Sequence, residues 1–415
     1  MTTYLPRSLE AAVARASAHF PVVLVTGPRQ VGKTSLLRHL ARESRTYVTL
    51  DEPVAAALAR DEPALFLRRF PPPVLIDEVQ YAPQLLPHIK MAVDTGPRAG
   101  DFWLTGSQQF HLMRGVSESL AGRVAVVQLQ GFSQFEVCNL AAAHCPFLPT
   151  LEVVNQRRTA LTTGSTRAAS PSDRVFERIW RGSFPAFALQ PDMDRDLFYG
   201  SYVQTYLQRD VRDLARVGDS GTFLKFLRAA AARSGQLLNV ADMARDCDIA
   251  PNTAKSWLSV LEATGLVMLL QPWSTNLSKR LVKAPKLYVL DTGLCCYLTR
   301  WPSPETLEAG AMAGAMLETF VVAEIARSWL HAGKEPPMWF YRDKDKVEID
   351  ILLIMGDTAH PVEVKATAAP TRRAIRHFGK LERAGLRRGE GAVTCLVDTM
   401  MPLTETDTAL PVGWL

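Results

Sequence analysis

The sequence predicts an α/β protein with a parallel-sheet domain at its N-terminal end, a helical middle and a second α/β domain at its C-terminal end. Three observations lead to this fold class. The β-branched run VVLVT, residues 22–26, is typical of a buried parallel strand, and a glycine-rich loop and a helical pattern follow it. Two helical patterns, VFERIWRGSFPAFAL and FYGSYVQTYLQRDVRDL, come after residue 173. Near the C-terminal end, VEIDILLI and HPVEVKA are expected to be strands of another sheet.

Composition fits this multidomain organisation. The chain has 415 residues, of which 47% are hydrophobic and 21% charged, as in a globular protein of about three domains. The N-terminus has no basic start before an apolar core, and no apolar run approaches the ~20 residues of a membrane helix, so we expect a cytoplasmic protein without membrane partners. The six cysteines form no CxxC pair and are expected to be reduced. The net charge of +5 permits nucleic acid as a partner without arguing for it.

The first strand leads directly into GPRQVGKT, residues 27–34, and then into the helical SLLRHL. This is the spacing and context of a phosphate-binding loop, in which backbone N–H groups surround the phosphates and the helix N-terminus faces the anion. Lys33 is expected to reach the β- and γ-phosphates and Thr34 to ligate magnesium. A chance glycine turn is the alternative. The residues expected to bind ATP and Mg²⁺ are Gly27, Gly32, Lys33, Thr34 and Ser35.

Further strands are expected at YVTLD, VLIDE, FWLT and VAVVQLQ. Asp77 ends the run VLID, so it emerges at the carboxyl edge of the sheet, where it can hold the magnesium shell. Glu78, beside it, is our candidate catalytic base. Ser107 and Gln108 leave the next strand and would approach the γ-phosphate; ordinary turn chemistry is the alternative.

An extra strand between the P-loop strand and the Asp-Glu strand, with a polar sensor after the next strand, resembles the AAA-type division of P-loop ATPases. In that division an arginine just before the fifth strand commonly acts as a finger in the neighbouring subunit's site, which implies this role for Arg123. An ion pair within the chain is the alternative, and Arg114 is the second candidate finger.

Residues 141–172 are rich in Thr, Ala and Ser without sustained periodicity, and we expect an exposed insertion or linker there. Arg209, Asp210 and Arg212, in the helical segment that follows, are expected to form ion pairs. The stretch LNVADMARDCDIAPNTAKSWLSVLEATGLVMLLQPW then gives a helix, a turn, a helix and a strand, the order of a winged helix.

On the second of these helices, Ala254, Leu258 and Leu261 form the expected inward stripe. Polar residues on the opposite side and a basic wing would meet DNA; docking to a protein is the alternative. The DNA-binding candidates in this region are Asn252, Thr253, Lys255, Lys279 and Arg280.

The C-terminal strands carry charged side chains on largely apolar runs. Glu363 and Lys365 are two positions apart and therefore share one strand face, and Asp350 on the preceding strand can meet them. This arrangement indicates a metal-dependent site or a solvated sheet surface. The stretch TRRAIRHFGKLERAGLRRGE follows, and we expect it to be a helix with a basic stripe for DNA phosphates. The stripe comprises Arg372, Arg376, Lys380, Arg383 and Arg387.

Across nearly its whole length the chain resembles bacterial and archaeal AAA-type P-loop ATPases fused to a C-terminal domain of uncharacterised type, with a winged helix and a restriction-endonuclease-like PD-(D/E)xK fold. The matching stretches are GPRQVGKTSLL, VLIDEVQ, LTGSQQ, LAGR, YLQRDV, LYVLDTGL, GAMLETFVVAEI, EIDILLI and VEVKA. The resemblance implies a nuclease-like site of Glu318, Asp350, Glu363 and Lys365, with Asp350 and Glu363 as metal ligands. GFSQFE departs from the family, which usually has a proline after the fifth strand, and so does the insertion, which puts the domain boundary in doubt.

The expected domains are an AAA-type ATPase domain at 1–140, the linker at 141–172, a helical segment at 173–235, a winged helix at 236–298 and a restriction-endonuclease-like domain at 299–415. The function we expect is that of an oligomeric ATP-hydrolysing protein, with a ring or hexamer among the expected assemblies, that acts on double-stranded or branched DNA. The alternative is a nucleotide-gated regulatory, defence or antitoxin-like switch whose nuclease-like fold only binds a partner.

Overall fold

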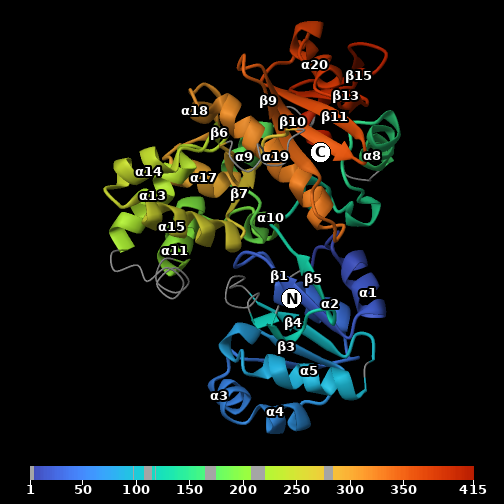
Figure 1. Cartoon of the computed structure of the whole chain (residues 1–415), viewed down its shortest axis with the longest axis vertical. Coiled ribbons are helices and arrows are strands. Elements are labelled where there is room, and N and C mark those ends of the chain that lie inside the picture. Colours follow the sequence, from blue (N-terminus) through green and yellow to red (C-terminus); the bar gives the residue numbers. More distant parts are fainter. Residues whose placement is uncertain are drawn as a thin grey trace. The chain divides into compact units, whose positions relative to one another are not determined.

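The computed structural model describes residues 4–96, 98–106, 115–116, 118–163, 174–206, 220–274 and 284–415 (Figure 1). The chain divides into two compact units. The first comprises residues 1–131 with the short segments 263–265 and 330–334, and the second contains the remainder. No helix of the described part of the chain is long and apolar enough to cross a membrane.

The first unit contains a parallel five-stranded sheet in the order β2-β3-β4-β1-β5. The bounds of these strands are β1 Val22–Thr26, β2 Thr46–Thr49, β3 Val74–Asp77, β4 Phe102–Thr105 and β5 Val124–Gln128. All residues of β1, β3 and β4 are buried, as the continuous apolar runs predict for strands covered on both faces. Strand β4 lies between the P-loop strand β1 and the Asp-Glu strand β3 in the sheet, whereas β2, which separates these two strands along the chain, lies at the edge.

Helices connect the parallel strands of this unit, as crossovers require. Their bounds are α1 Glu10–His19, α2 Lys33–Ala41, α3 Pro53–Asp61, α4 Pro63–Arg69 and α5 Leu85–Thr95. The core under α3–α5 is one apolar cluster centred on Phe66, Ile76 and Ile89, each fully buried. This packing fixes the carboxyl edge of the sheet, where the sequence places the phosphate-binding residues.

The second unit begins with short helices, and here one expectation is wrong. Within the expected linker, residues 151–163 form helix α8 (Leu151–Thr163). Arg157 on this helix is almost fully buried, and its guanidinium donates to the Cys145 carbonyl at 2.6 Å and the Trp414 carbonyl at 3.2 Å. Figure 1 shows α8 beside the C-terminal strands. The stretch looked like a linker because it is rich in Thr, Ala and Ser. Of the residues that the structure describes in this helix, Val154 and Arg157 are buried, and Arg157 is charged.

Other helices of this region are α7 Gln134–Val137, α9 Val175–Arg181, α10 Pro185–Leu189, α11 Arg195–Tyr206 and α13 Ser220–Ala231. The ion-pair candidates Arg209, Asp210 and Arg212 lie outside the described residues.

The expected helix, turn, helix and strand are present as α14 (Val240–Cys247), α15 (Pro251–Ala263) and β7 (Val267–Leu270). Strand β7 joins a small sheet in the order β6-β8-β7, completed by β6 (Gln236–Leu237) and β8 (Lys286–Val289). On α15 the inward stripe Ala254, Leu258 and Leu261 is buried, as its spacing predicts. Asn252 and Lys255 are exposed and Thr253 is half-buried.

The C-terminal part carries a second sheet, in the order β14-β15-β13-β11-β10-β9, with β12 beside β11. Helices α17 Thr292–Leu298, α18 Pro304–Glu308 and α19 Ala313–Leu330 precede it, and η5 Val412–Trp414 ends it. The strands are β9 Met338–Arg342, β10 Glu348–Met355, β11 Thr358–Lys365, β12 Arg387–Arg388, β13 Gly391–Cys395, β14 Met401–Pro402 and β15 Asp407–Pro411. Strands β9, β10 and β11 are antiparallel neighbours, which confirms the strands expected here.

The basic helix expected over residues 371–390 does not form. The stretch holds a short 3₁₀ helix η4 (Arg372–Ile375), a single turn α20 (Lys380–Arg383) and strand β12. Glycines at 379 and 385 interrupt it, the second with a φ of +78°. Glycine weakens helices, and like charges four residues apart repel each other, so the charge spacing alone does not stabilise a helix.

Candidate functional sites

The loop after β1 is shaped by two glycines. Gly27 has a φ of +139°, and a Cβ atom on it would lie 1.9 Å from the Leu129 carbonyl oxygen. Gly32 has a φ of +92° and leads into α2. Only glycine fits at position 27, because both the backbone angle and the close approach of the neighbouring strand exclude a side chain.

Lys33 begins α2 and is buried. Its Nζ donates to the carbonyl oxygens of Gly27 at 3.0 Å and Pro28 at 2.8 Å, so the ammonium group lies within the curve of the loop. Ser35 is exposed in the first turn of the same helix. The loop, the helix N-terminus and the lysine together provide donors for an anion of the size of a phosphate.

Asp77, at the end of β3, joins the loop to the sheet. The Thr34 hydroxyl donates to Asp77 Oδ1 at 2.7 Å, and the Tyr47 hydroxyl lies 3.2 Å from Oδ2. Thr105, at the end of β4, donates to the same carboxylate. Burial and the charge of Asp77 raise the pKa of Tyr47 above its ordinary value. The hydroxyl and carboxylate oxygens fit a magnesium ion, which prefers hard oxygen ligands.

Glu78 has left-handed backbone angles, φ 58° and ψ 46°, which are uncommon outside glycine. Its N–H donates to Thr105 Oγ1 at 2.9 Å, and its carboxylate accepts from the Gln80 amide. Thr105 therefore contacts both acidic residues. Sequence reasoning did not single out Thr105 or Tyr47, although both lie on strands that flank β3.

Four further residues were expected at the ATP site, and the structure describes one of them, Arg123. Ser107 and Gln108 lie outside the described residues, as does Arg114. Arg123 pairs with Asp94 through two contacts, of 2.5 and 3.1 Å, with about a third of its side chain exposed. This is the ion pair within the chain that the sequence left open as the alternative to an arginine finger.

Arg7 is a contributor that the sequence did not reveal. Its guanidinium is buried and donates to the carbonyls of Val31 at 2.7 Å, Gln130 at 2.8 Å and Gly131 at 3.2 Å. It thus ties the phosphate-binding loop to the segment that follows β5. No local pattern marks this residue, because its partners are far away in the chain.

The second candidate site lies on the C-terminal sheet. Ile351 pairs with Val362 in the β10–β11 register, which brings Asp350 next to Glu363. Lys365 Nζ lies 2.7 Å from Glu363 Oε2 and 3.5 Å from Asp350 Oδ2, and the Val364 N–H donates to Asp350 at 2.9 Å. The three side chains expected to meet do meet.

The two carboxyl groups of this site, Asp350 and Glu363, differ in their protonation. Burial and the adjacent Asp350 raise the pKa of Glu363 to about 9. Burial opposes ionisation of Asp350 too, yet the hydrogen bond from Glu363 and the charge of Lys365 hold the pKa of Asp350 below its usual value. The pair is therefore one protonated and one ionised carboxyl group that share a hydrogen bond.

Glu318, on α19, is held by residues that were not predicted. Lys286 of β8 donates to Glu318 Oε1 at 2.8 Å and lies 2.6 Å from Glu348 Oε1, with 4% of its side chain exposed. The Tyr288 hydroxyl donates to the same Glu318 oxygen at 2.5 Å. Burial alone would lower the pKa of Lys286, but the surrounding carboxylates raise it above its ordinary value. Lysine 286 is thus a built-in counter-ion of the acidic cluster.

These contacts bear on a metal at this site. Asp350 and Glu363 provide adjacent oxygen donors of the type that Mg²⁺ and Mn²⁺ prefer, whereas Glu318 already accepts from Lys286 and Tyr288. Over the described ranges, no group of three or more His, Cys, Asp and Glu side chains is placed to hold a metal ion. The residues fit a cation bound by the Asp350–Glu363 pair alone and do not fit the three-carboxylate set.

A cleft of about 650 Å³ opens over this pair. Its basic side chains are Lys346, Lys365, Arg373 and Arg376, with His377 beside them. Arg372 instead donates to the Leu403 carbonyl, and Lys380 pairs with Asp343 at 3.1 Å. Of the basic residues expected to contact DNA here, only Arg376 lines the cleft. Lys279 and Arg280 lie outside the described residues.

Two curated proteins are similar over almost the whole chain, the uncharacterized proteins Rv2008c of Mycobacterium tuberculosis and Mb2031c of Mycobacterium bovis. Each is 30% identical over 409 residues, which cover 98% of this chain and 83% of the relative. The chain belongs to their family. In this family member, residues 19–138 match an AAA domain, while 172–305 and 313–415 match domains of unknown function (DUF8612 and DUF4143). The N-terminal domain is therefore an AAA-type P-loop ATPase domain, as the sequence predicts.

Solved structures with related folds were also found. The Walker-type ATPase PABY2304 of Pyrococcus abyssi is 15% identical with a TM-score of 0.45, covering 71% of this chain and 96% of that chain. The RuvB Holliday junction branch migration motor of Thermotoga maritima is 16% identical with a TM-score of 0.29, covering 63% of this chain and 86% of that chain. At these scores neither likeness bears on the chemistry of the sites.

Proposed function

We propose that the protein hydrolyses ATP at the Gly27–Thr34 loop and uses the resulting changes to control DNA bound by its C-terminal modules. The observation that carries the first part is the hydrogen bond from Thr34 to Asp77, which brings a magnesium-ligating hydroxyl and a carboxylate together beside the buried Lys33. In this assignment Lys33 binds the phosphates, Thr34 and Asp77 hold magnesium, and Glu78 activates the water.

DNA binding is supported by the basic cleft. Lys346, Arg373 and Arg376 line it, and no carboxylate of the described residues pairs with any of them. Together with Lys365 they provide several cations in one cleft, which would attract backbone phosphates. The exposed Asn252 and Lys255 at the start of α15 supply a second contact surface, in the place that a recognition helix would occupy.

DNA cleavage is a narrower proposal. Asp350 and Glu363 would hold a divalent cation, which would supply Lewis-acid stabilisation of a phosphate when bound. Lys365 would stabilise negative charge on the attacked phosphate. If the site cuts, Asp350→Ala and Lys365→Ala each abolish nicking with magnesium or manganese and leave ATP hydrolysis unchanged. No cleavage of linear, supercoiled or branched DNA with either metal, together with unchanged DNA affinity of Asp350→Ala, would refute it.

One observation favours the second candidate, a nucleotide-gated switch whose nuclease-like fold binds a partner without cutting. Glu318 already accepts hydrogen bonds from Lys286 and Tyr288, so side chains of the protein itself neutralise the acidic cluster. ATPase rates measured with single-stranded, double-stranded and branched DNA separate the two functions. Stimulation by DNA that falls steeply with salt supports the DNA-acting protein, whereas indifference to all nucleic acids and tight capture of a protein support the switch.

Assembly into an oligomer is part of the proposal. For Arg123 to complete a neighbour's site, it would have to leave Asp94, a half-exposed pair worth at most about 1 kcal/mol. Mixing Arg123→Ala subunits with Lys33→Ala subunits should then restore some activity, because a mixed interface can pair an intact loop with an intact finger. A monomer with full ATPase activity would refute this assignment.

A further inference from the structure

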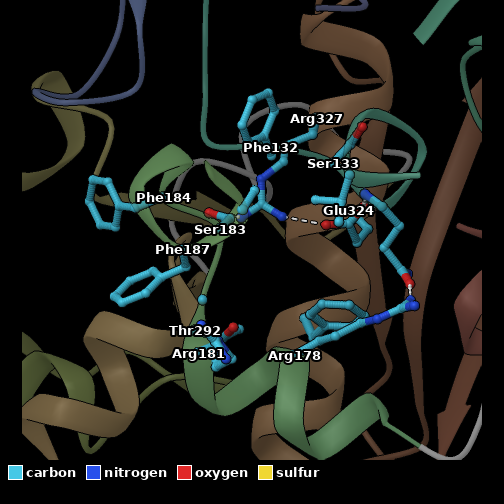
Figure 2. A pocket seen from close by; sticks show the side chains of 15 residues that line it. Phe132, Ser133, Arg178, Arg181, Ser183, Phe184, Phe187, Thr292, Glu324 and Arg327 are labelled. Atoms are coloured by element: carbon cyan, nitrogen blue, oxygen red, sulfur yellow. Dashed lines mark hydrogen bonds and ion pairs between the residues drawn. The ribbon is translucent and has the colours of Figure 1, made fainter. Parts of the chain in front are cut away.

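A separate pocket of about 130 Å³ lies in the second unit, among α7, α9, α10 and α19. Figure 2 shows Phe184 and Phe187 on one side of it and Arg178 and Glu324 on the other. None of its lining residues belongs to the phosphate-binding loop or to the Asp350–Glu363 cleft.

The charge of this lining is uneven. Arg327 and Glu324 pair with each other, and Glu324 also accepts the Gln134 N–H at 3.0 Å, so both of these buried charges are accounted for. Arg178 and Arg181, one turn apart on α9, have only neutral oxygen acceptors, the Gln134 side-chain carbonyl and the Pro191 backbone carbonyl. No carboxylate of the described residues pairs with either of them. The pocket thus has an uncompensated positive charge on one wall.

A second wall, which Arg181 adjoins through the Phe187 ring, is aromatic. Phe184 packs against Phe198 with ring centroids 5.4 Å apart, and Phe187 packs against Phe198 at 4.9 Å and Tyr199 at 5.4 Å. Phe132 and Phe320 add further apolar surface. Such a wall favours a flat apolar group, which stacks on rings that are already held in place.

We propose that this pocket binds a small organic anion with a flat apolar body. Arg178 and Arg181 bind its carboxylate or phosphate group, since guanidinium groups match both anions in geometry and charge. Phe184 and Phe187 pack against the body. The lining suits a ligand of this kind, because small-molecule sites typically place a few polar groups among apolar ones.

The pocket is connected to the ATP site through the chain. Its residues Phe132, Ser133 and Gln134 directly follow Gly131, whose carbonyl accepts from Arg7, and Arg7 also holds Val31 of the phosphate-binding loop. A ligand that fixes the segment after Gly131 therefore restrains residues that are bonded directly to Gly131, and Gly131 accepts from the arginine that holds the loop. A change in ATP turnover on binding is a second consequence, and this consequence alone rests on the proposed ATPase function.

The test is a fluorescence titration of the full chain with 8-anilinonaphthalene-1-sulfonate, followed by displacement with 2-naphthoate and 2-naphthyl phosphate. We expect saturable binding at one site and displacement by one or both compounds, the more effective one identifying the anionic group. Arg178→Gln/Arg181→Gln should weaken binding at least about tenfold, because each arginine contributes a charged hydrogen bond. The control is Arg174→Gln, because Arg174 lies just before the same helix, outside the pocket, and pairs with Glu177.

Equal affinity of the double variant and the parent would overturn the proposal, as would unsaturable binding or equally tight binding of the neutral 2-naphthol. Should the double variant lose its thermal unfolding transition, the single Arg181→Gln variant decides, since Arg181 bonds only to the Pro191 carbonyl and contacts the Phe187 ring. Binding without any change in ATP turnover would remove the proposed connection to the ATP site and leave the binding site in place.

Discussion

Replacing Glu363 by Gln should reduce the pH dependence of the free energy of unfolding of the second unit. The folded state holds the Glu363 proton up to a pKa of about 9, whereas the unfolded chain releases it near 4.5. Between these values the folded state binds more protons than the unfolded one, so stability falls as pH rises. Glutamine cannot ionise, yet it can still accept from Lys365 and donate to Asp350.

The expected size follows from the linkage relation. One proton retained on folding gives a slope of about 1.4 kcal/mol per pH unit, so Glu363 should cost the parent about 2 to 3 kcal/mol between pH 6 and pH 8. Glu363→Gln should lack this loss and be more stable than the parent at pH 8.

Urea unfolding in the presence of EDTA measures this difference. Seven of the eight tryptophans belong to the second unit, so their fluorescence follows its unfolding. Glu382→Gln, at an exposed position, is the control and should keep the slope of the parent. Parallel pH profiles for the parent and Glu363→Gln over this range would refute the assignment of a shared proton.

Two further changes test the two sites. Lys286→Met should destabilise the second unit by about 3–5 kcal/mol in the same urea assay, because it leaves Glu318 without its buried counter-ion, while Glu348 keeps its pair with Arg342; a loss below about 1 kcal/mol would contradict the ion-pair account. Gly27→Ala should abolish binding of a fluorescent ATP analogue while far-ultraviolet circular dichroism stays unchanged, since its methyl group would meet the Leu129 carbonyl; retained affinity would show that the loop can absorb this clash.

The sequence predicted best what depends on local order. A strand, a glycine loop and a helix are contiguous in the chain, so their order can be read directly. The proximity of Thr34 to Asp77 follows from the rule that parallel strands end at one edge of the sheet. The meeting of Asp350 with Glu363 was likewise accessible, because strand periodicity fixes which side chains share a face.

What the sequence could not predict depends on distant partners. Arg7 and Lys286 carry no local pattern, and their roles appear only when the fold brings carbonyls or carboxylates to them. Helix α8 was missed because its stretch is rich in Thr, Ala and Ser, and the contacts of Arg157 that hold it in place are to distant carbonyls. The spacing of Arg372, Arg376 and Lys380 matched a helix, but spacing of charges does not outweigh interrupting glycines.

The central claim is ATP hydrolysis at the Gly27–Thr34 loop with Glu78 as base, and phosphate release tests it most directly. The parent protein, Lys33→Ala and Glu78→Gln are compared with magnesium and ATP, and nucleotide binding is measured on the same samples. We expect turnover by the parent, no binding by Lys33→Ala, and undiminished binding by Glu78→Gln with hydrolysis slowed at least about 100-fold. Hydrolysis by Glu78→Gln at the parent rate would contradict the assignment of the base, and a parent protein that neither binds nor hydrolyses ATP would contradict the account as a whole.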